Sequence, residues 1–387
     1  MKVLWLASWF PNRTDPFNGD FVERHAYATA PFTDKLFVIA VIKDEHLRRG
    51  KVEIVQKQEG NLFFYRVYYG KGKWGGIAER LFSFKKYYAL QKKVYTQIVQ
   101  EHGQPEIVHV HVPFKAGVFA MHLKQQCHIP YIVTEHWAGY DKNCVPSIYD
   151  LGRTFRRINT MVLKAASLLL PVSDHLGKLV TNNFAGIPYQ SIPNVADTSL
   201  FYYKEHAPAV FRFIHPSYMN YQKNPEGILA ACKILADKGC PFELLMVGND
   251  DKRLQDIAAK AGLLNKYVFF RAAVPYAVVA ELMQESSALL LFSRFENLPC
   301  VIIEALCTGL PVISTAAGGI PEIINDTNGI LVENENIEEL ANAMQQLINN
   351  YNHYDRKQIA AASNAKFSYD VVGKQYGDVY DMISKNK

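Results

Sequence analysis

The sequence predicts an α/β protein with two doubly wound domains, and three features of the chain point to this class. Short apolar runs alternate with amphipathic helical patterns, which is typical of parallel strands joined by crossover helices. This alternation is interrupted near residues 194–210 and then begins again. A chain of 387 residues also exceeds the size that one hydrophobic core usually serves. Two domains of similar construction are therefore expected.

Strands are expected in the first half wherever turn residues bound an apolar run. Several of these runs are nearly continuous in apolar residues, as strands buried on both faces are. They cover residues 2–8, 35–42, 61–69, 106–112, 131–136, 167–173 and 189–193. Helical patterns follow most of them, and residues 19–30 and 116–127 are two examples. We interpret the first run as a buried strand rather than a signal peptide, because no small-residue cleavage pattern follows it.

The second half repeats the same order of strands and helices. Its helical patterns include residues 225–239 and 276–290, and an amphipathic pattern over residues 368–384 ends the chain. Its strands are expected at residues 211–217, 242–248, 267–272, 288–293, 311–315 and 329–332. Open parallel sheets bind ligands beyond the carboxyl ends of their strands, so two such domains in tandem would form a binding cleft between these edges.

Composition excludes several classes of protein. The net charge is +5 without a long run of Lys or Arg, so we expect an anionic ligand or surface as the partner and no nucleic acid. The six cysteines form no C-x-x-C pair, which indicates reduced thiols and a cytoplasmic location. No stretch reaches the roughly 18 apolar residues that a membrane-spanning helix requires.

Two carboxylates interrupt an otherwise apolar segment, "SRFENLPCVIIEALCTGLPVIST", at residues 293–315. Glu296 and Glu304 are its only charged residues after Arg294. A buried carboxylate needs a partner, which is either another part of the protein or a ligand.

A helix is expected to begin near Asn297–Pro299 and to end at Gly309, because Pro suits the first turn of a helix and Gly the residue after its end. Glu296 would then lie in the loop before the helix and Glu304 about two turns inside it. The free amides of the first turn suit phosphate or sugar oxygens. The spacing alone also fits a simpler interpretation, in which Glu296 caps the helix and Glu304 is a solvated helix residue.

The pattern S-x-x-E-x-x-P-x-x-x-x-E-A, followed by "GLPVIST" and "GGIPEII", resembles the donor site of retaining glycosyltransferases of family GT4, which have the GT-B fold. In that family the two glutamates form the E-x7-E signature. Further segments match in the same order along almost the whole chain, and the match is most specific in the second half. These segments are "GDFVERHA", "EIVHVHV", "VTEHWAGY", "IPNVADTSLF", "QKNPEGIL" and the final helix "KFSYDVVGKQYGDVY".

The resemblance implies two Rossmann-like domains that face a central cleft. Residues 1–195 would form the acceptor domain and residues 196–367 the nucleotide-sugar donor domain, while residues 368–387 would form a helix that packs back on the first domain. The implied reaction moves a sugar from a nucleoside-diphosphate sugar to an acceptor hydroxyl with retention of the anomeric configuration. A capsular polysaccharide, a lipopolysaccharide or another cell-surface glycan is the implied product.

The resemblance also assigns roles in the donor domain. Lys223 would act as a catalytic cation that neutralises the diphosphate leaving group, although a surface lysine that caps its loop is the alternative. Glu296 would hold hydroxyl groups of the donor sugar, with the amides of Asn297 and Leu298 shaping the pocket. Glu304 would accept hydrogen bonds from the ribose, so that donor hydroxyls supply the missing partners of both carboxylates.

One position of the predicted substrate site departs from the family pattern. The family usually has an arginine five residues before the lysine, where this chain has Tyr218. Either Lys223 and helix amides suffice for the phosphates, or Arg271 or Arg294 takes part. The backbone around Val274 would contact the nucleobase, so the sequence does not distinguish a UDP-, GDP- or ADP-sugar as donor.

In the first domain the matching motifs carry Gly19 and His136. Gly19 opens the first helix and would let the backbone approach the diphosphate. His136 follows the strand "YIVTEH" and would face the donor sugar, although such a histidine can also serve only as a structural hydrogen-bond partner. His109 and His111 alternate on one strand, lack an evident third ligand and are interpreted as strand residues rather than a metal site.

Neither a metal nor another cofactor is expected. The chain lacks the D-x-D motif with which another class of glycosyltransferase often holds a divalent cation. A covalent route to retention would use Glu296 as the nucleophile. We favour a front-face substitution, the usual account for the family, in which the departing phosphate helps to deprotonate the acceptor.

Other functions stay open beside the transferase. The segment "GKGKWG" at residues 70–75 matches a dinucleotide-binding pattern, but it does not follow the first strand and no acidic residue follows at the usual distance. A non-catalytic protein that binds nucleotide sugars and a nucleotide-sugar epimerase of the same fold are the alternatives. Tyr218 in place of the usual arginine is the one feature that favours the non-catalytic protein.

A basic segment at residues 71–95 combines seven Lys or Arg residues with one Glu and several aromatic residues. Helices of this kind bind anionic membranes, although a solvated helix face is the alternative. We therefore expect a cytoplasmic protein that docks on the inner face of a membrane to reach a glycan or lipid-linked acceptor.

Overall fold

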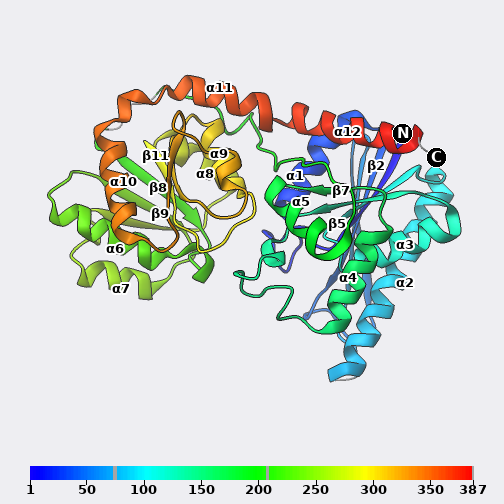
Figure 1. Ribbon diagram of the computed structural model, residues 1–387. Helices are drawn as coiled ribbons and strands as arrows, with labels where there is room; N and C mark the ends of the chain where they lie inside the picture. The colour runs from blue at the N-terminus through cyan, green and yellow to red at the C-terminus, as the bar shows by residue number, and fades with distance from the viewer. Residues whose placement is uncertain (73–75, 206–208, 386–387) are drawn as a thin grey trace. The chain divides into compact units, whose positions relative to one another are not determined.

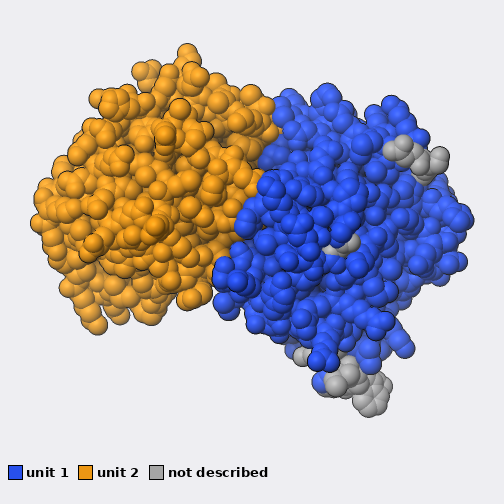
Figure 2. Space-filling model, viewed as in Figure 1, with its two compact units in different colours: residues 1–193, 369–387 blue, residues 194–368 orange. Residues whose placement is uncertain are grey.

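The chain divides into two compact units, which Figure 2 shows in different colours. Unit 1 comprises residues 1–193 and 369–387, and unit 2 comprises residues 194–368. The sequence analysis places its domain boundaries after residues 195 and 367. The computed structural model describes residues 1–72, 76–205 and 209–385. Part of the "GKGKWG" segment, residues 73–75, therefore lies outside the described residues.

Unit 1 is built on a seven-stranded sheet with the order β3-β4-β2-β1-β5-β6-β7 (Figure 1). Neighbouring strands are parallel except β3 and β4, which are antiparallel. The central strands β1, β2, β5 and β6 are almost completely buried, as parallel strands covered on both faces are. The bounds are β1 (Lys2–Ala7), β2 (Lys35–Lys43), β3 (Val52–Glu59), β4 (Leu62–Tyr69), β5 (Ile107–His111), β6 (Tyr131–Glu135) and β7 (Leu169–Pro171).

The edge strand β3 is the element of this sheet that the sequence analysis does not predict. Most of its side chains are polar and exposed, so no apolar run marks it. It pairs with β4 across a turn at Gly60, whose φ of 59° suits glycine. The sequence analysis also predicts a strand at residues 189–193 that does not form. Only an isolated bridge between Leu169 and Tyr189 is found there.

The helices of unit 1 agree closely with the predicted patterns at residues 19–30 and 116–127. The helix α12 comes from the C-terminal end of the chain and packs against α1. The indole of Trp5 donates to the hydroxyl of Tyr380 on α12 at 2.9 Å, so this last helix completes the core of unit 1. The bounds are α1 (Asp20–Thr29), α2 (Gly76–His102), α3 (Ala116–Cys127), α4 (Arg153–Ala165), α5 (Asp174–Val180) and α12 (Tyr369–Lys385).

Unit 2 contains a six-stranded, fully parallel sheet with the order β10-β9-β8-β11-β12-β13. All of its strands lie within the predicted apolar runs, which confirms the doubly wound α/β class. The bounds are β8 (Arg212–Ser217), β9 (Glu243–Gly248), β10 (Val268–Ala272), β11 (Ala288–Leu291), β12 (Val312–Thr315) and β13 (Gly329–Val332). Large apolar side chains of these strands, among them Phe213 and Leu290, form a core with the helices on the sheet.

Two helices of unit 2 differ from their predicted limits. The helix predicted at residues 276–290 ends at Gln284, because Ala288 already belongs to β11. The helix of Glu304 begins at Cys300, so Glu304 lies just over one turn inside it rather than two. Gly309 follows this helix with φ 80°, as predicted for its C-terminal end. The bounds are α6 (Pro225–Asp237), α7 (Lys252–Lys260), α8 (Tyr276–Gln284), α9 (Cys300–Cys307), α10 (Ile337–Asn349) and α11 (Arg356–Phe367).

Short helical turns complete the two units. In the described parts of the chain, five are 3₁₀ turns, at Ala30–Phe32, Ala138–Tyr140, Tyr221–Lys223, Ile320–Glu322 and Tyr351–His353, and one is a π turn at Thr181–Ala185. Within the described ranges, no helix is both long and apolar enough to cross a membrane.

Candidate active site

The carboxyl edge of the unit 2 sheet brings most of the predicted donor residues together. The strand order reverses between β8 and β11, so the loops after these two strands flank the point at which doubly wound sheets bind ligands. Residues 218–224 follow β8 and residues 292–299 follow β11. Lys223 lies on the first of these loops and Glu296 on the second.

Lys223 and Glu296 form an ion pair across this switch point. Only 15% of the lysine side chain and 6% of the glutamate side chain are exposed, so water screens the pair weakly. The ammonium group donates to Oε1 of Glu296, and its other two protons remain for further acceptors. The protein itself therefore supplies the partner that the Glu296 carboxylate requires.

Local hydrogen bonds give the lysine loop a fixed shape. The side chain of Asn220 accepts from the N–H of Lys223 at 3.2 Å, and that of Asn224 accepts from the N–H of Gly227 at 3.3 Å. Asn224 has φ 48°, a left-handed conformation that asparagine adopts more readily than most residues. These two caps fix how α6 leaves the loop and so position Lys223.

Arg294 supports the same loop from the strand β11 side. Its guanidinium donates to the carbonyl of Tyr221 at 2.6 Å and to Glu335 at 2.8 Å, and it lies 4.3 Å from the centre of the Tyr221 ring. Arg271 is exposed at the end of β10. Tyr218, the residue that departs from the motif, is 51% exposed. Of the two arginines considered as replacement cations, Arg294 therefore contacts the lysine loop directly through its hydrogen bond to Tyr221.

A buried histidine at the base of the lysine loop escaped the sequence analysis. Nδ1 of His215 donates to the carbonyl of Leu290 at 2.8 Å, and Nε2 lies 2.8 Å from the hydroxyl of Ser217. Ser217 accepts from the N–H of Met219 at 3.0 Å. Burial, with a smaller contribution from nearby Lys223, lowers the pKa of His215 to about 4 against the opposing effect of the Leu290 bond. A neutral His215 therefore anchors the start of this loop.

A close backbone contact shapes the loop of Glu296. Gly318 has φ 58°, and a Cβ atom there would lie 2.2 Å from the carbonyl oxygen of Glu296. Asn297 and Leu298, which the motif assigns to the sugar pocket, are 7% and 4% exposed. The carbonyl of Leu298 accepts from the side chain of Asn194 at 2.6 Å. Segments after β12 and before β8 therefore hold this loop in place.

Glu304 lies on α9 and is 5% exposed. The hydroxyl of Tyr276, the first residue of α8, donates to its Oε1 at 2.7 Å. Val274 lies two residues before Tyr276 in the loop after β10 and is half-buried. Both glutamates thus have partners within unit 2. Protein groups thus supply a first partner for each carboxylate, which keeps further acceptor positions for ligand hydroxyl groups.

Gly19 precedes α1 in unit 1 and has φ 67°. A Cβ atom there would lie 2.6 Å from the backbone carbonyl carbon of Trp9. No larger residue fits without moving the chain, so the close approach of the two ends of the segment between β1 and α1 is itself a reason for glycine at this position.

His136 follows β6 in unit 1, is 9% exposed and lies among other rings. Its Nε2 is 3.4 Å from Nδ1 of His111, and its ring centre is 4.6 Å from that of Phe21. The backbone N–H of His136 donates to Glu135 at 2.8 Å. Burial raises the pKa of Glu135 to about 7, although hydrogen bonds from the backbone and from Tyr140 oppose this. Glu135, which the sequence analysis did not single out, thus positions the loop of His136.

His109 and His111 are buried residues of β5, as predicted. Ring nitrogens of His109 lie 2.6 Å from the hydroxyl of Thr134 and 2.7 Å from that of Tyr380. Burial lowers the pKa of both histidines well below the usual value, so both are neutral near pH 7. No group of three or more His, Cys, Asp or Glu side chains in the described residues could hold a metal ion.

Three supporting residues of unit 2, His215, Tyr276 and Gly318, differ in the signal that they leave in the sequence. The double glycine at residues 318–319 indicates a close backbone approach, and the proline before Tyr276 indicates a helix start. His215 lies within an apolar strand run, and only its tertiary partners reveal what it does.

Two family models match the chain, one on each half. The model described as Glycosyl transferases group 1 matches residues 208–364. The model described as Glycosyl transferase 4-like domain matches residues 57–194. The two matches together span most of the described chain.

Relatives and solved structures extend over the full length. The putative teichuronic acid biosynthesis glycosyltransferase TuaC of Bacillus subtilis strain 168 is 24% identical over 397 residues, which cover 97% of this chain and 95% of that protein. Sucrose-phosphate synthase from Thermosynechococcus elongatus has a TM-score of 0.83 at 17% identity, with 100% of both chains covered. HepE of Anabaena in complex with UDP has a TM-score of 0.72 at 17% identity, with 99% of this chain and 100% of that chain covered. At these identities the structures show a shared fold.

Proposed function

This chain belongs to the GT4-type glycosyltransferases with the GT-B fold, and we propose that it is a retaining enzyme that uses a nucleoside-diphosphate sugar as donor. The observation that carries the proposal is the ion pair of Lys223 and Glu296. It lies between the two loops that flank the switch point of unit 2, where a doubly wound sheet binds a nucleotide. A cation and a carboxylate held together there suit a ligand with both phosphates and hydroxyl groups.

The charge that develops on the leaving diphosphate is the main demand on such a site. Lys223 keeps two protons for phosphate oxygens while it remains bonded to Glu296. The amides at the start of α6, directly after Lys223, add a positive end of a helix. We assign the leaving-group role to Lys223 and this helix end, in a loop that has Tyr218 where the family usually has an arginine.

The remaining donor contacts follow from the motif and the loops around it. Glu296, with Asn297 and Leu298, would hold the donor sugar. The carboxylate of Glu304, which Tyr276 orients, would accept hydrogen bonds from the ribose hydroxyl groups. The backbone near Val274 would contact the nucleobase. From unit 1 we propose that Gly19 serves the diphosphate and His136 the donor sugar.

Retention is proposed to proceed by front-face substitution rather than through a covalent intermediate. The carboxylate of Glu296 is bonded to Lys223, which lowers its nucleophilicity and favours a role in holding hydroxyl groups. In this route the departing phosphate accepts the proton of the acceptor hydroxyl. A glycosyl–Glu296 adduct trapped and identified by mass spectrometry would contradict it. The proposal requires no metal ion or other cofactor.

The acceptor is proposed to be a growing cell-surface glycan, free or lipid-linked. The name of the relative TuaC, a putative teichuronic acid biosynthesis glycosyltransferase, supports polysaccharide synthesis. The solved complex of HepE with UDP supports a UDP-sugar among the candidate donors, beside GDP- and ADP-sugars. A cytoplasmic location with docking on an anionic membrane completes the proposal.

Release of nucleoside diphosphate from a panel of UDP-, GDP- and ADP-sugars tests this function directly. We expect slow hydrolysis with one nucleotide class, at the same rate with and without EDTA. Binding without release for every donor would favour the non-catalytic alternative, and conversion of the donor to its epimer would favour an epimerase. Activity that EDTA abolishes and Mg²⁺ restores would contradict metal independence.

A further inference from the structure

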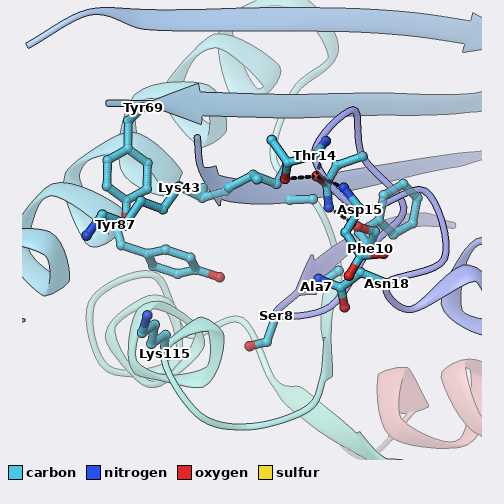
Figure 3. A pocket seen from close by; sticks show the side chains of 14 residues that line it. Ala7, Ser8, Phe10, Thr14, Asp15, Asn18, Lys43, Tyr69, Tyr87 and Lys115 are labelled. Carbon is cyan, nitrogen blue, oxygen red and sulfur yellow. Dashed lines mark hydrogen bonds between the residues drawn. The ribbon is translucent and has the colours of Figure 1, made fainter. Parts of the chain in front are cut away.

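Unit 1 contains a cavity of about 360 Å³ beyond the carboxyl ends of β1, β2 and β4 (Figure 3). None of the residues assigned to the donor lines it. Its walls come from the loop after β1, the ends of β2 and β4, helix α2 and the turn before α3. The lining side chains that matter for its chemistry are Ser8, Thr14, Lys43, Tyr69, Tyr87 and Lys115.

Lys115 is a half-buried cation without a carboxylate partner in the described residues. Its Nζ lies 5.9 Å from the centre of the Tyr87 ring, a weak cation–π distance. Burial lowers the pKa of Lys115, and the second cavity lysine, Lys43, lowers it further. The folded protein therefore holds a positive charge here at a cost that an anionic ligand would offset.

The carboxylates near the cavity do not cancel this charge. Oε1 of Glu79 lies 3.3 Å from Nζ of Lys43, and it also accepts hydrogen bonds from the N–H of Gly72 and the hydroxyl of Ser83. Asp15 lines the cavity as well, but in Figure 3 it lies on the opposite side from Lys115. The cavity is thus cationic at one end and rich in neutral and acidic hydrogen-bonding groups at the other.

Tyr87 presents a second feature of a binding site. Its side chain is 4% exposed, and its hydroxyl makes no hydrogen bond of normal geometry to any described residue. The nearby hydroxyl of Ser8 donates to the carbonyls of Val112 and Phe114. Burial raises the pKa of Tyr87, with a smaller opposing effect from Ser8, so the hydroxyl stays protonated. A buried donor on the cavity wall is therefore available to an acceptor oxygen.

The backbone holds Lys115 in an unusual conformation. Lys115 has φ 68° and Val112 has φ 63°, and both values are uncommon for residues other than glycine. The two hydrogen bonds from Ser8 span this turn and stabilise it. Lys115 directly precedes the twelve-residue helix α3, whose first amides add positive potential. Strain of this kind persists where the surrounding structure fixes it, and it is common at functional sites.

We propose that this cavity binds the carboxylate or phosphate group of an acidic sugar, with Lys115 as the charge partner and Tyr87 as a hydrogen-bond donor. Thr14 and the other polar side chains opposite suit the neutral hydroxyl groups of the same sugar. The inference rests on the proposed function where it identifies this sugar as the acceptor. It narrows the acceptor from any glycan to an acidic one.

Binding to the full chain without a donor tests the cavity. Three soluble probes separate the chemistries: methyl glucuronide carries a carboxylate, glucose 6-phosphate carries a phosphate, and methyl glucoside is neutral. We expect one or both acidic probes to bind at least tenfold more tightly than methyl glucoside by calorimetry or saturation-transfer NMR, and their order identifies the anion. Equal affinities for all three probes would overturn the proposal.

Four variants locate the binding. Lys115→Gln should weaken binding of the acidic probe about tenfold or more, because a charged hydrogen bond is lost. Lys115→Arg keeps the charge and should retain most of the affinity. Tyr87→Phe should weaken binding of the probe with little loss of thermal stability, since the hydroxyl makes no hydrogen bond of normal geometry to the described residues. Lys164→Gln, at an exposed position of α4, is the control and should leave binding unchanged. Unaltered affinity in Lys115→Gln would refute the assignment.

Donor measurements keep this proposal separate from the proposed function. If the acidic probe binds but no sugar nucleotide is turned over, the cavity stands and the transferase proposal fails. If a donor is hydrolysed but the protein binds neither acidic probe more tightly than methyl glucoside, the transferase proposal stands and the proposal of an acidic acceptor is wrong.

Discussion

Lys223 and Glu296 lie 73 residues apart in the chain and meet through the geometry of one parallel sheet. An ion pair of this low exposure has two interpretations, a structural link between loops or a poised ligand site. Removal of one partner leaves a largely buried charge uncompensated in either case, so single variants alone do not distinguish the two.

A double-variant cycle separates these interpretations. Lys223→Met and Glu296→Gln should each lower the free energy of unfolding by about 2–3 kcal/mol, and the double variant should regain part of that loss because no lone charge remains. Donor turnover should stay low in all three, because the ligand contacts are lost each time. Denaturant unfolding and release of nucleoside diphosphate are the two measurements. Recovery of turnover together with stability would show that the pair is only structural.

His215 gives a prediction for pH. Its pKa is lowered to about 4 in the folded protein, against about 6.5 in the unfolded chain. Between these values the unfolded chain binds a proton that the folded protein does not, so stability falls as the pH drops from about 6.5 to 4. Over that window the contribution of His215 is roughly 3 kcal/mol. The free energy of unfolding of His215→Gln, measured by denaturant unfolding, should fall less steeply with decreasing pH in this window than that of the unaltered protein. An equal slope in both proteins would contradict the assignment.

At the scale of elements, the site depends on loops that pack on one another rather than on isolated motifs. The segment after β12 supports the Glu296 loop through Gly318, and Arg294 braces the lysine loop. Helix α8 orients Glu304 through Tyr276. The geometry of the candidate site in unit 2 is therefore distributed over four strand ends.

Gly318→Ala tests that packing, with Gly262→Ala as a matched control. Both glycines have positive φ, 58° and 70°, so both variants carry similar backbone strain of about 1 kcal/mol. Only the Cβ at residue 318 would meet another atom, the carbonyl of Glu296, while nothing lies within 4 Å of the Cβ at residue 262. We expect at least a tenfold loss of donor turnover in the first variant alone, as a displacement near 1 Å can cause. Similar turnover in both variants would argue against a positioning role for Gly318.

The whole molecule consists of two sheets of related topology, each with its own core. Unit 2 follows the order of a dinucleotide-binding sheet, 3-2-1-4-5-6, when its strands are numbered along the unit. Unit 1 contains an antiparallel pair of strands at its edge and also includes the last helix of the chain, α12. Tyr380 of this helix accepts a hydrogen bond from the indole of Trp5. Deletion of that helix would therefore remove part of the core of unit 1.

The exposed face of α2 is the feature with which the molecule would meet a membrane. Leu81 and Phe82 are 61% and 44% exposed, and Lys85, Lys92 and Lys93 are exposed along the same helix. Each lysine near an anionic surface contributes about 1 kcal/mol of binding. We expect the protein to sediment with phosphatidylserine vesicles at low salt.

Charge-matched variants make this expectation specific. The triple change of Lys85, Lys92 and Lys93 to Gln should release the protein from the vesicles. The same change at Lys252, Lys260 and Lys357 of unit 2 removes equal charge elsewhere and should not. Identical sedimentation of both triple variants would attribute any binding to net charge alone.

Apolar periodicity determined most of the fold by itself, because strands buried on both faces leave continuous apolar runs that the sequence shows directly. The runs of β8 to β13 were all recognised, and the E-x7-E motif drew attention to the loop of Glu296 after β11. The polar edge strand β3 escaped because nearly all of its side chains are exposed, so no apolar pattern marks it. Only the tertiary structure decided how the charges of the site are satisfied. Glu296 meets Lys223 and Glu304 meets Tyr276 through strand order, which brings distant loops together and which no local pattern encodes.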